Sequence, residues 1–425
     1  MLQIHWHSKT WFKLRFSGFD DEWIEEKLGN LVQIKSGECT KNLITGIDNS
    51  IPYFKVEQLN NSLKYQIKTP YFINDKSKIV NKGSIIFPKR GAAILLNKIR
   101  ILNQDSFMDT NLMTLTPNNK LYNEFLYYFI YKENLSKIAD TTSIPQLNNK
   151  HIKPYPIKLP SFEEQLKISK FISSVDKKVA LLSQNLEIFN DFKKGLLQQI
   201  FTQKLRFNFN DAWKTVKIKD IFDERSEKGF LDLELLSVTL NDGVIKRSEI
   251  ESKDNSNENK SNYKHVLPGD IVYNSMRMWQ GASGVSPYEG IVSPAYTILI
   301  PKNVYSKYFG YYFKTNEMVY QFKKYSQGLT SDTWNLKYPL ISEIKIKIPS
   351  IEEQKEITNV FEIMDEKIKI LQNNIDELTT FKKGLLQQMF IVRINWRCNF
   401  KLAKSPSFNK HLLILKNKII FIIIK

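Results

Sequence analysis

The chain has 425 residues, and its 62 Lys and Arg against 44 Asp and Glu give a formal net charge of +18, which favours an anionic partner such as a nucleic acid. Its two cysteines, Cys39 and Cys398, stand far apart without further ligands at metal spacing, so the sequence supports neither a disulfide framework nor a metal site. No apolar run resembles a secretory signal or is long enough for a membrane span, and we expect a cytoplasmic protein.

In chain order, a short segment at 1–19 is followed by a first globular region at 20–158 and, after a helical region, by a second one at 204–347. Both contain β-branched and aromatic runs bounded by turn residues, for example at 83–87 and 269–273. We interpret each as a mixed α/β domain. Two domains also suit the length of the chain.

An internal repeat marks the helical regions at 159–203 and 348–390. The sequence Leu-Pro-Ser-Phe-Glu-Glu-Gln at 159–165 returns as Ile-Pro-Ser-Ile-Glu-Glu-Gln at 348–354, an offset of 354 − 165 = 189. With the same offset, Phe-Lys-Lys-Gly-Leu-Leu-Gln-Gln at 192–199 returns unchanged at 381–388. Each copy is expected to form one long helix, because Ser161 or Ser350 is followed three residues later by Glu164 or Glu353, the pattern of a reciprocal capping box.

Apolar residues follow at alternating spacings of four and three, which is typical of a coiled-coil seam. They are Ile168, Ile172, Val175, Val179, Leu182, Leu186 and Phe189 in the first copy and Ile357, Phe361, Met364, Ile368, Leu371, Ile375 and Leu378 in the second. Lys193 and Lys382 interrupt the next seam position. At 1.5 Å per residue each helix would run roughly 60 Å, too long for one small domain to cover. We therefore expect the two helices to pair with each other.

A weaker repeat precedes each globular region: Lys-Leu-Arg-Phe at 13–16 with Trp23 matches Lys-Leu-Arg-Phe at 204–207 with Trp213. The order is thus globular, helix, globular, helix. The predicted fold is α+β, with two similar mixed α/β domains joined by two long antiparallel coiled-coil helices that are related by a pseudo-two-fold axis.

Together these motifs resemble the specificity subunit of type I restriction-modification systems. The helix openings and endings carry the resemblance, with the segments 83–91, 269–281 and 290–296. The resemblance implies two target-recognition domains that read a bipartite target in double-stranded DNA. It also implies two modification subunits that form an adenine methyltransferase with this chain, and restriction subunits that can join them. The basic, Ile-rich tail at 391–425 has no counterpart in this pattern.

The sequence lacks the motifs of two catalytic classes. It has no Asn or Asp followed by Pro-Pro and an aromatic residue, as an amino-methyltransferase needs, and no phosphate-binding loop. We therefore expect a non-catalytic chain without a cofactor. Two alternatives stay open: a catalytic fusion enzyme, and a basic coiled-coil scaffold that binds DNA without sequence preference.

Polar and basic residues on turns beside strands are the candidates for DNA contact, because such side chains read the edges of bases. They are Lys89, Arg90, Asn111, Ser143, Gln146 and Asn148 in the first domain and Arg277, Gln280, Ser331, Thr333 and Asn335 in the second. Arg277 and Gln280 are the approximate counterparts of Lys89 and Arg90. A phosphate contact or a plain turn is an equally open reading for several of them. The candidates for helix pairing or for binding partner subunits are Glu164, Gln165, Lys193, Lys194, Gln198, Gln199, Glu353, Gln354, Lys382, Lys383, Gln387 and Gln388.

Overall fold

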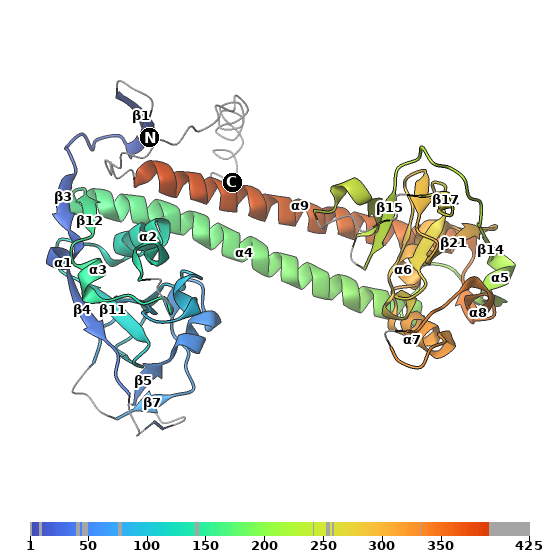
Figure 1. The fold of residues 1–425 in the computed structure, drawn as a ribbon, viewed down its shortest axis with the longest axis horizontal. Coiled ribbons are helices and arrows are strands. Elements are labelled where there is room, and N and C mark those ends of the chain that lie inside the picture. The colour runs from blue at the N-terminus through green and yellow to red at the C-terminus, as the bar shows by residue number, and fades with distance from the viewer. Residues whose placement is uncertain are drawn as a thin grey trace. The chain divides into compact units, whose positions relative to one another are not determined.

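The chain divides into two compact units, each with one globular part and pieces of both long helices (Figure 1). The computed structural model describes residues 2–7, 11–39, 43–44, 50–74, 79–140, 144–240, 242–251, 256, 259–331 and 333–390, with the side chains of 2–13 left out. Of the described residues, unit 1 holds those up to Ser173 and those from Lys383 to Phe390, and unit 2 holds those from Ser174 to Lys382. The tail at 391–425 lies outside the described residues.

Unit 1 is built around a mixed five-stranded sheet in the order β4-β11-β8-β9-β6. Its strands are β4 (Val32–Ser36), β11 (Leu112–Pro117), β8 (Ile85–Pro88), β9 (Arg100–Leu102) and β6 (Tyr65–Gln66). A smaller sheet joins β10 (Phe107–Met108), β5 (Ile51–Phe54) and β7 (Phe72–Ile73), while β1 (Leu2–His7) pairs with β2 (Trp11–Phe16) and β3 (Ile24–Lys27) with β12 (Pro156–Leu159). The helices are α1 (Leu28–Leu31), α2 (Asn123–Glu133) and α3 (Asn149–Ile152), with 3-10 turns η1 (Val56–Asn61), η2 (Ala92–Ile94) and η3 (Leu135–Ile138).

Unit 2 repeats this plan with a four-stranded sheet in the order β14-β21-β18-β19. Its strands are β14 (Phe222–Glu224), β21 (Tyr296–Pro301), β18 (Ile271–Asn274) and β19 (Ser283–Val285). Three antiparallel pairs complete it: β13 (Lys214–Lys217) with β22 (Lys345–Ile348), β15 (Leu236–Thr239) with β16 (Gly243–Lys246), and β17 (Lys264–Val266) with β20 (Gly290–Val292). The helices are α5 (Ile218–Ile221), α6 (Ser306–Tyr312), α7 (Asn316–Tyr325) and α8 (Tyr338–Ile341), with 3-10 turns η4 (Arg247–Glu249) and η5 (Met278–Gln280).

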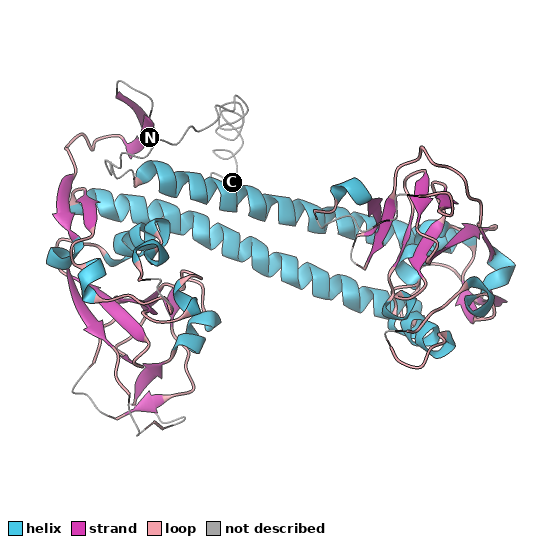
Figure 2. Cartoon of the chain, in the orientation of Figure 1, coloured by secondary structure: helices cyan, strands magenta, loops and turns pink. Residues whose placement is uncertain are grey.

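The two units confirm the predicted pair of similar mixed α/β domains (Figure 2). In each, a two-stranded ribbon at the base joins the start of the domain to the strand that leads into a long helix, β3 with β12 and β13 with β22. In each, a central strand lies between two antiparallel neighbours, β11 between β4 and β8, and β21 between β14 and β18. A helix with buried aromatic side chains then covers the core, α2 in unit 1 and α6 in unit 2.

The long helices are α4 (Phe162–Phe201) and α9 (Ile351–Met389), and all fourteen residues of the predicted seams are buried or half-buried. Within unit 2 the two helices run antiparallel, because Lys193 pairs with Asp365 while Lys382 pairs with Asp176 at 2.6 Å. The two ion pairs are equivalent in the repeat, because Lys382 corresponds to Lys193 and Asp365 to Asp176, each at the offset of 189 residues (382 − 193 and 365 − 176). The lysines that interrupt the seam therefore bind an acidic residue of the opposite helix.

The start of α4 is tied to unit 1 by a buried ion pair. Both carboxylate oxygens of Glu164 accept hydrogen bonds from the Arg15 guanidinium, at 2.9 and 2.7 Å, and one also accepts from the indole nitrogen of Trp23 at 3.1 Å. The hydroxyl of Ser161 accepts from the backbone nitrogen of Glu164 at 3.3 Å, which is the forward half of the expected capping box. The other half of the box, a bond from the Ser161 backbone nitrogen to the Glu164 carboxylate, was predicted wrongly. The carboxylate instead accepts from Trp23 and Arg15, which are 141 and 149 positions away in the sequence.

The start of α9 is held in unit 2 by the same arrangement. The carboxylate of Glu353 accepts from Arg206 at 3.1 and 2.7 Å and from Trp213 at 3.2 Å, and the Ser350 hydroxyl accepts from the Glu353 backbone nitrogen at 3.3 Å. This clamp explains the weaker repeat in the sequence. The same Arg and Trp recur in both halves of the sequence because each such pair binds the glutamate at the start of the long helix that follows its domain.

The far end of each long helix also carries a repeated anchor, 390 − 201 = 189 residues apart. In unit 2, Phe201 stacks on Tyr312 with ring centroids 5.1 Å apart. In unit 1, Phe390 packs on Phe125 at 4.8 Å, and its carbonyl accepts from the Lys132 amine at 2.9 Å. Each unit therefore contains the beginning of one long helix and the end of the other.

Candidate nucleic-acid interface

In unit 1, the candidate residues described by the structure gather where β8 ends and where the segment before α3 runs beside it. The backbone nitrogen of Lys89 donates to the carbonyl of Asn111 at 2.8 Å, and the nitrogen of Leu147 donates to the carbonyl of Lys89 at 2.8 Å. Arg90 and Gln146 face each other in an isolated antiparallel bridge. The fold thus brings together residues that are up to 59 positions apart in the sequence (148 − 89).

The side chains of this group differ in exposure. Arg90 is exposed, whereas Lys89, Asn111, Gln146 and Asn148 are half-buried. Burial and the neighbouring charge of Arg90 lower the pKa of Lys89. Among these candidates, Arg90 is therefore the side chain with the clearest access to an anionic partner.

A bridge between Asp140 and Gln146 closes the adjoining turn, with backbone hydrogen bonds of 2.9 and 3.0 Å. The Asp140 carboxylate contacts Lys150 at 3.1 Å and His151 at 3.2 Å, and Lys150 lowers its pKa, with His151 adding to that effect. The candidate Ser143 lies outside the described residues.

In unit 2, Arg277 and Gln280 are both exposed at the turn η5 that follows β18, Arg277 as its N-cap and Gln280 as its last residue. The turn is anchored from below by Met278, which is fully buried, and ends at Gly281 in the left-handed region, with φ of +85°. Helix α7 packs against this turn. The turn therefore holds the two polar side chains outward on a supported backbone.

A second loop, which we name the tip loop (residues 327–335, with Asp332 undescribed), lies beside η5 and carries Ser331, Thr333 and Asn335. Gln327 and Asn335 exchange backbone hydrogen bonds of 3.0 and 2.8 Å, and the nitrogen of Leu336 donates to the carbonyl of Ser275 at 2.8 Å. Ser331 and Thr333 are exposed, whereas Asn335 is half-buried. All five candidates of unit 2 therefore lie on two loops that share one hydrogen-bonded base.

The hydrogen bonds also show which positions correspond between the units. Leu147 and Leu336 donate to Lys89 and Ser275, and Lys89 and Ser275 donate in turn to Asn111 and Ala295. Ser275 is thus the backbone counterpart of Lys89. Arg277, expected to be the approximate counterpart, lies two residues further on, because η5 extends the chain differently from the segment after Lys89.

The sequence reasoning missed two side chains, Trp334 and Lys323, that brace the unit 2 loops together with Trp279. Trp279 of η5 and Trp334 of the tip loop meet edge to face with ring centroids 5.3 Å apart. The amine of Lys323, near the end of α7, lies 5.4 Å from the centre of the Trp334 ring. Trp334 directly precedes the candidate Asn335, and a tryptophan in a loop rich in Ser, Thr and Asn is the signal that could have identified it.

The repeated helix residues fall into three groups. Glu164, Gln165, Glu353 and Gln354 are buried, and Lys193 and Lys382 form the ion pairs between the helices. Lys194, Gln198, Gln199, Lys383 and Gln387 are exposed, and Gln388 is half-buried. Gln165 and Gln354 close the helix starts, since each donates to the proline carbonyl before the helix, at 3.1 and 3.0 Å. Only the third group is open to another subunit.

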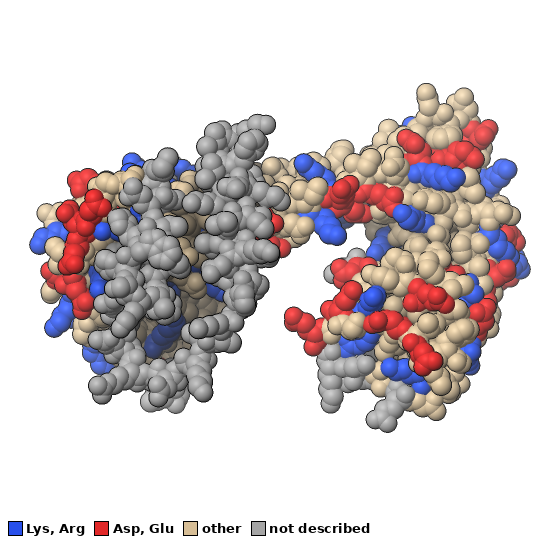
Figure 3. All heavy atoms as spheres, turned by 90° about the horizontal axis from the view of Figure 1, so that it is seen from above, with Lys and Arg blue, Asp and Glu red and all other residues tan. Residues whose placement is uncertain are grey.

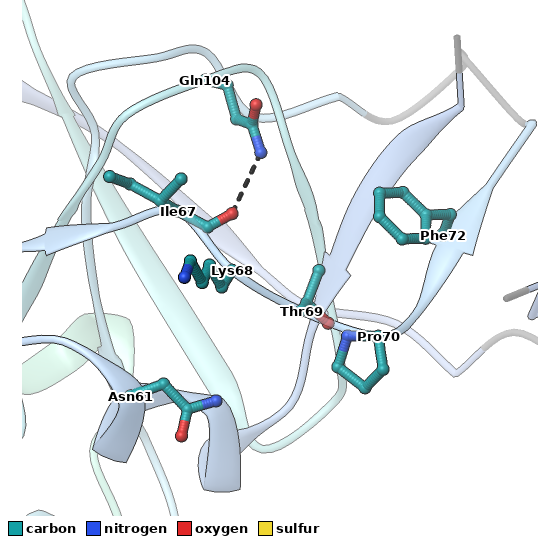
Figure 4. A pocket seen from close by; sticks show the side chains of 7 residues that line it. All are labelled: Asn61, Ile67, Lys68, Thr69, Pro70, Phe72 and Gln104. Atoms are coloured by element: carbon teal, nitrogen blue, oxygen red, sulfur yellow. Dashed lines mark hydrogen bonds between the residues drawn. The ribbon is translucent and has the colours of Figure 1, made fainter. Parts of the chain in front are cut away.

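Two further surface features limit the chemistry. Figure 3 shows acidic and basic side chains interspersed on the face drawn there, rather than one uniformly basic patch. An open pocket of unit 1 is lined by Asn61, Ile67, Lys68, Thr69, Pro70, Phe72 and Gln104 (Figure 4). This lining includes no carboxylate or imidazole, so it lacks a pair of groups for acid–base catalysis.

Among the described residues, no three His, Cys, Asp or Glu side chains lie close enough to hold a metal ion. In the same part of the chain, no helix combines the length and the apolar character that crossing a bilayer requires.

Comparison with known proteins gives concordant matches over most of the chain. The family model of the type I restriction modification DNA specificity domain matches twice, at residues 20–188 and 210–380. The chain is 24% identical to the type I restriction enzyme MjaVIII specificity subunit of Methanocaldococcus jannaschii, over 88% of this chain and 93% of the relative. The crystal structure of the type I restriction-modification S subunit from M. genitalium is similar with a TM-score of 0.56 at 16% identity, over 89% of this chain and 98% of that one.

Proposed function

The chain belongs to the type I restriction-modification DNA specificity family, and we propose that it reads a bipartite target in double-stranded DNA, one half-site with each globular domain. The observation that carries this proposal is the shared backbone frame at Lys89 and Ser275, on which each unit holds an exposed arginine, Arg90 or Arg277. Arginine on a supported turn can bind guanine with two hydrogen bonds in the major groove. The alternative of a scaffold without sequence preference receives no support from the family match.

In unit 1, the reading residues proposed are Lys89, Arg90, Asn111, Gln146 and Asn148, with Ser143 added from the sequence alone. In unit 2 they are Arg277, Gln280, Ser331, Thr333 and Asn335. Exposed members supply direct contacts. Half-buried members hold the turns, and the Gln146 amide, 3.5 Å from the Asn148 side-chain oxygen, shows how such residues brace one another.

Methyl transfer and DNA cleavage belong, in this proposal, to partner subunits. Two modification subunits would complete an adenine methyltransferase, and restriction subunits could join that complex. The exposed repeat residues Lys194, Gln198 and Gln199, with Lys383 and Gln387 of the other helix, offer two equivalent surfaces. Equivalent surfaces suit a pair of identical partners, since the repeat places the same side chains twice.

The experiment compares the purified full chain with the same chain assembled with the modification subunits of its host. The chain alone should bind DNA weakly and transfer no methyl groups, whereas the assembly should methylate adenines within one bipartite motif. Methyl transfer by the isolated chain would contradict the division of labour. Equal binding of the assembly to all sequences would contradict sequence reading.

A further inference from the structure

Leu329, at the outer part of the tip loop, is the most exposed large apolar side chain among the described residues. Its side chain is 101% exposed, and the next such residue, Leu63, is 80% exposed. Single apolar side chains are ordinary on protein surfaces, so exposure alone has no functional meaning. The structure of the loop that carries this leucine supplies the second observation.

The tip loop is braced at its base and within its turn. The Gln327–Asn335 bridge closes it, and inside it the Thr330 backbone nitrogen donates to the Thr333 hydroxyl at 3.1 Å while the Thr333 nitrogen donates to the Thr330 carbonyl at 3.0 Å. Gly328 precedes the leucine with φ of +149°, and a Cβ there would lie 2.6 Å from the Thr333 carbonyl oxygen. The backbone around Leu329 is thus specified by close contacts.

The surroundings of the loop suit a nucleic acid. Thr330 and Ser331 place exposed hydroxyl groups beside the leucine, and hydroxyl groups commonly bind phosphate oxygens. The Thr333 hydroxyl instead donates to the Thr330 carbonyl within the turn, at 3.0 Å. The exposed Lys324 and Lys323 lie in the last turn of α7, and Lys323 contacts the Trp334 ring of the same loop. In such a surface the leucine would contact the stacked bases, while the hydroxyl groups and the lysines would bind the phosphates on either side.

Leucine offers no hydrogen-bonding group with which to read a base edge. Aliphatic side chains on DNA-binding proteins instead enter between neighbouring base pairs, unstack them in part and bend the duplex. The bending energy depends on the sequence, and pyrimidine–purine steps are the easiest to deform. An inserted leucine therefore selects a base step without a hydrogen bond.

From these observations we infer that Leu329 is a wedge that enters a base step at the second half-site and gives unit 2 a preference for a deformable step. The inference rests on the proposed function, because it needs a DNA target for unit 2. The corresponding turn of unit 1 carries Ile144, which is 60% exposed, next to residues 141–143 outside the described part. The inference concerns Leu329 and the second half-site.

The test uses the full chain assembled with its modification subunits, and a duplex that contains the sequence which this assembly methylates. The fluorescent base 2-aminopurine is placed at successive positions of the second half-site. With the unchanged chain, fluorescence should rise when 2-aminopurine replaces the adenine that is the target of methylation, because the methyltransferase takes this base out of the stack. It should also rise at one additional base step. Leu329→Ala should abolish the rise at the additional step, keep the rise at the adenine, and weaken binding about tenfold.

Two further variants keep the result interpretable. Leu231→Ala removes another exposed leucine of unit 2, 60% exposed, and should change neither signal. Gly328→Ala keeps the leucine but disturbs its backbone, and should reduce the additional signal. Because Leu329 has no core contacts to lose, its alanine variant is expected to fold.

Three outcomes overturn the inference. The additional signal could be absent with the unchanged chain, or could survive Leu329→Ala, and in either case no wedge exists. Leu329→Ala could instead weaken assembly with the modification subunits while base stacking stays the same, which would assign the leucine to a protein contact. If the unchanged assembly does not prefer its target over unrelated DNA, the proposed function itself fails, a result separate from these three.

Discussion

Unit 1 and unit 2 share the backbone frame that holds their candidate DNA-reading residues, but they differ in the loops built on it. The bridge partners that close the loop before the helix are 6 positions apart in unit 1 (146 − 140) and 8 apart in unit 2 (335 − 327). Unit 2 adds to this loop an exposed leucine, Leu329, and a tryptophan, Trp334, that packs edge to face on Trp279 of η5. The residues that attach each domain to its long helix are therefore the same in both units, whereas the loops that carry the candidate DNA contacts differ, as expected if the two domains read different sequences.

The attachment itself is nearly the same in both units, but its exposure differs. The side chain of Arg15 is 9% exposed in its pair with Glu164, and that of Arg206 is 22% exposed in its pair with Glu353. A better-shielded ion pair loses more when one partner is removed, because the remaining charge stays buried. The two clamps therefore allow a direct comparison of stability.

The largest change is expected when the paired helices are lengthened, because we expect them to set the length of the unread spacer between the two half-sites. One extra heptad in both α4 and α9, placed near Gln184 and at the facing point of the other helix, keeps the seam phase and lengthens the pair by roughly 10 Å, about three base pairs. The motif of methylated adenines should gain a longer unread spacer while both half-site sequences stay the same. An unchanged spacer in an active variant would show that the helices do not set the distance.

Removing the clamp carboxylate should have the next largest effect. Glu164→Gln leaves Arg15 without its charged partner and should destabilise unit 1 by about 3–5 kcal/mol, as for other buried pairs. Glu353→Gln should have a smaller effect on unit 2, and Glu163→Gln, at the exposed neighbouring position, should have almost none. Urea unfolding of the full chain measures all three. Equal losses for the two clamps would remove the role given to burial.

Exchanging single arginines tests whether each domain reads its own half-site. Arg277→Ala should relax one position of the second half-site, and Arg90→Ala one position of the first, each by about 1–3 kcal/mol if a two-hydrogen-bond contact to a base is lost. Binding to targets with single substitutions measures this. If a variant weakens binding to all sequences alike and lowers the salt dependence, its arginine contacts phosphate instead.

The smallest effect is expected from an exposed ion-pair cluster that unit 2 carries at its base. Hydrogen bonds from Lys217 and Lys219 lower the pKa of Glu343 from 4.5 to about 2. Because the pKa is lowered in the folded state, this contribution to stability is present above pH 4.5 and is lost as the pH falls towards 2. Unfolding of Glu343→Gln should therefore depend less on pH in this range than that of the unchanged chain. Parallel pH profiles would contradict the assignment.

The sequence was sufficient for features that depend on local spacing. The four-three seam and the Ser161 and Ser350 helix starts were predicted correctly, because helical periodicity and capping act between near neighbours. The lysines at 193 and 382 were recognised as interruptions, but their partners were not, since the residue opposite depends on how two distant helices align. The same reason explains why the repeated Arg and Trp were noticed without Glu164 and Glu353 as their partner.

The candidate site was less accessible to sequence reasoning. Turn residues such as Arg277 could be chosen by type, whereas the bracing of Trp334 by Trp279 and Lys323 brings together residues up to 55 positions apart (334 − 279). The shift by two between Arg277 and the counterpart of Lys89 arises from a short 3-10 turn, for which the sequence contains no clear signal. Loops of this kind take their shape from packing rather than from periodicity.

The central claim, one half-site for each domain on a two-fold frame, is tested most directly by a chain that carries the first domain twice. Residues 13–158 would replace 204–347, so that Arg15 and Trp23 take the places of Arg206 and Trp213 beside Glu353. The methylated adenines in the genome of a host with the modification subunits would then be mapped by single-molecule sequencing. The account predicts that the second half-site disappears and an inverted copy of the first takes its place. A motif that keeps the original second half-site in an active assembly would contradict it.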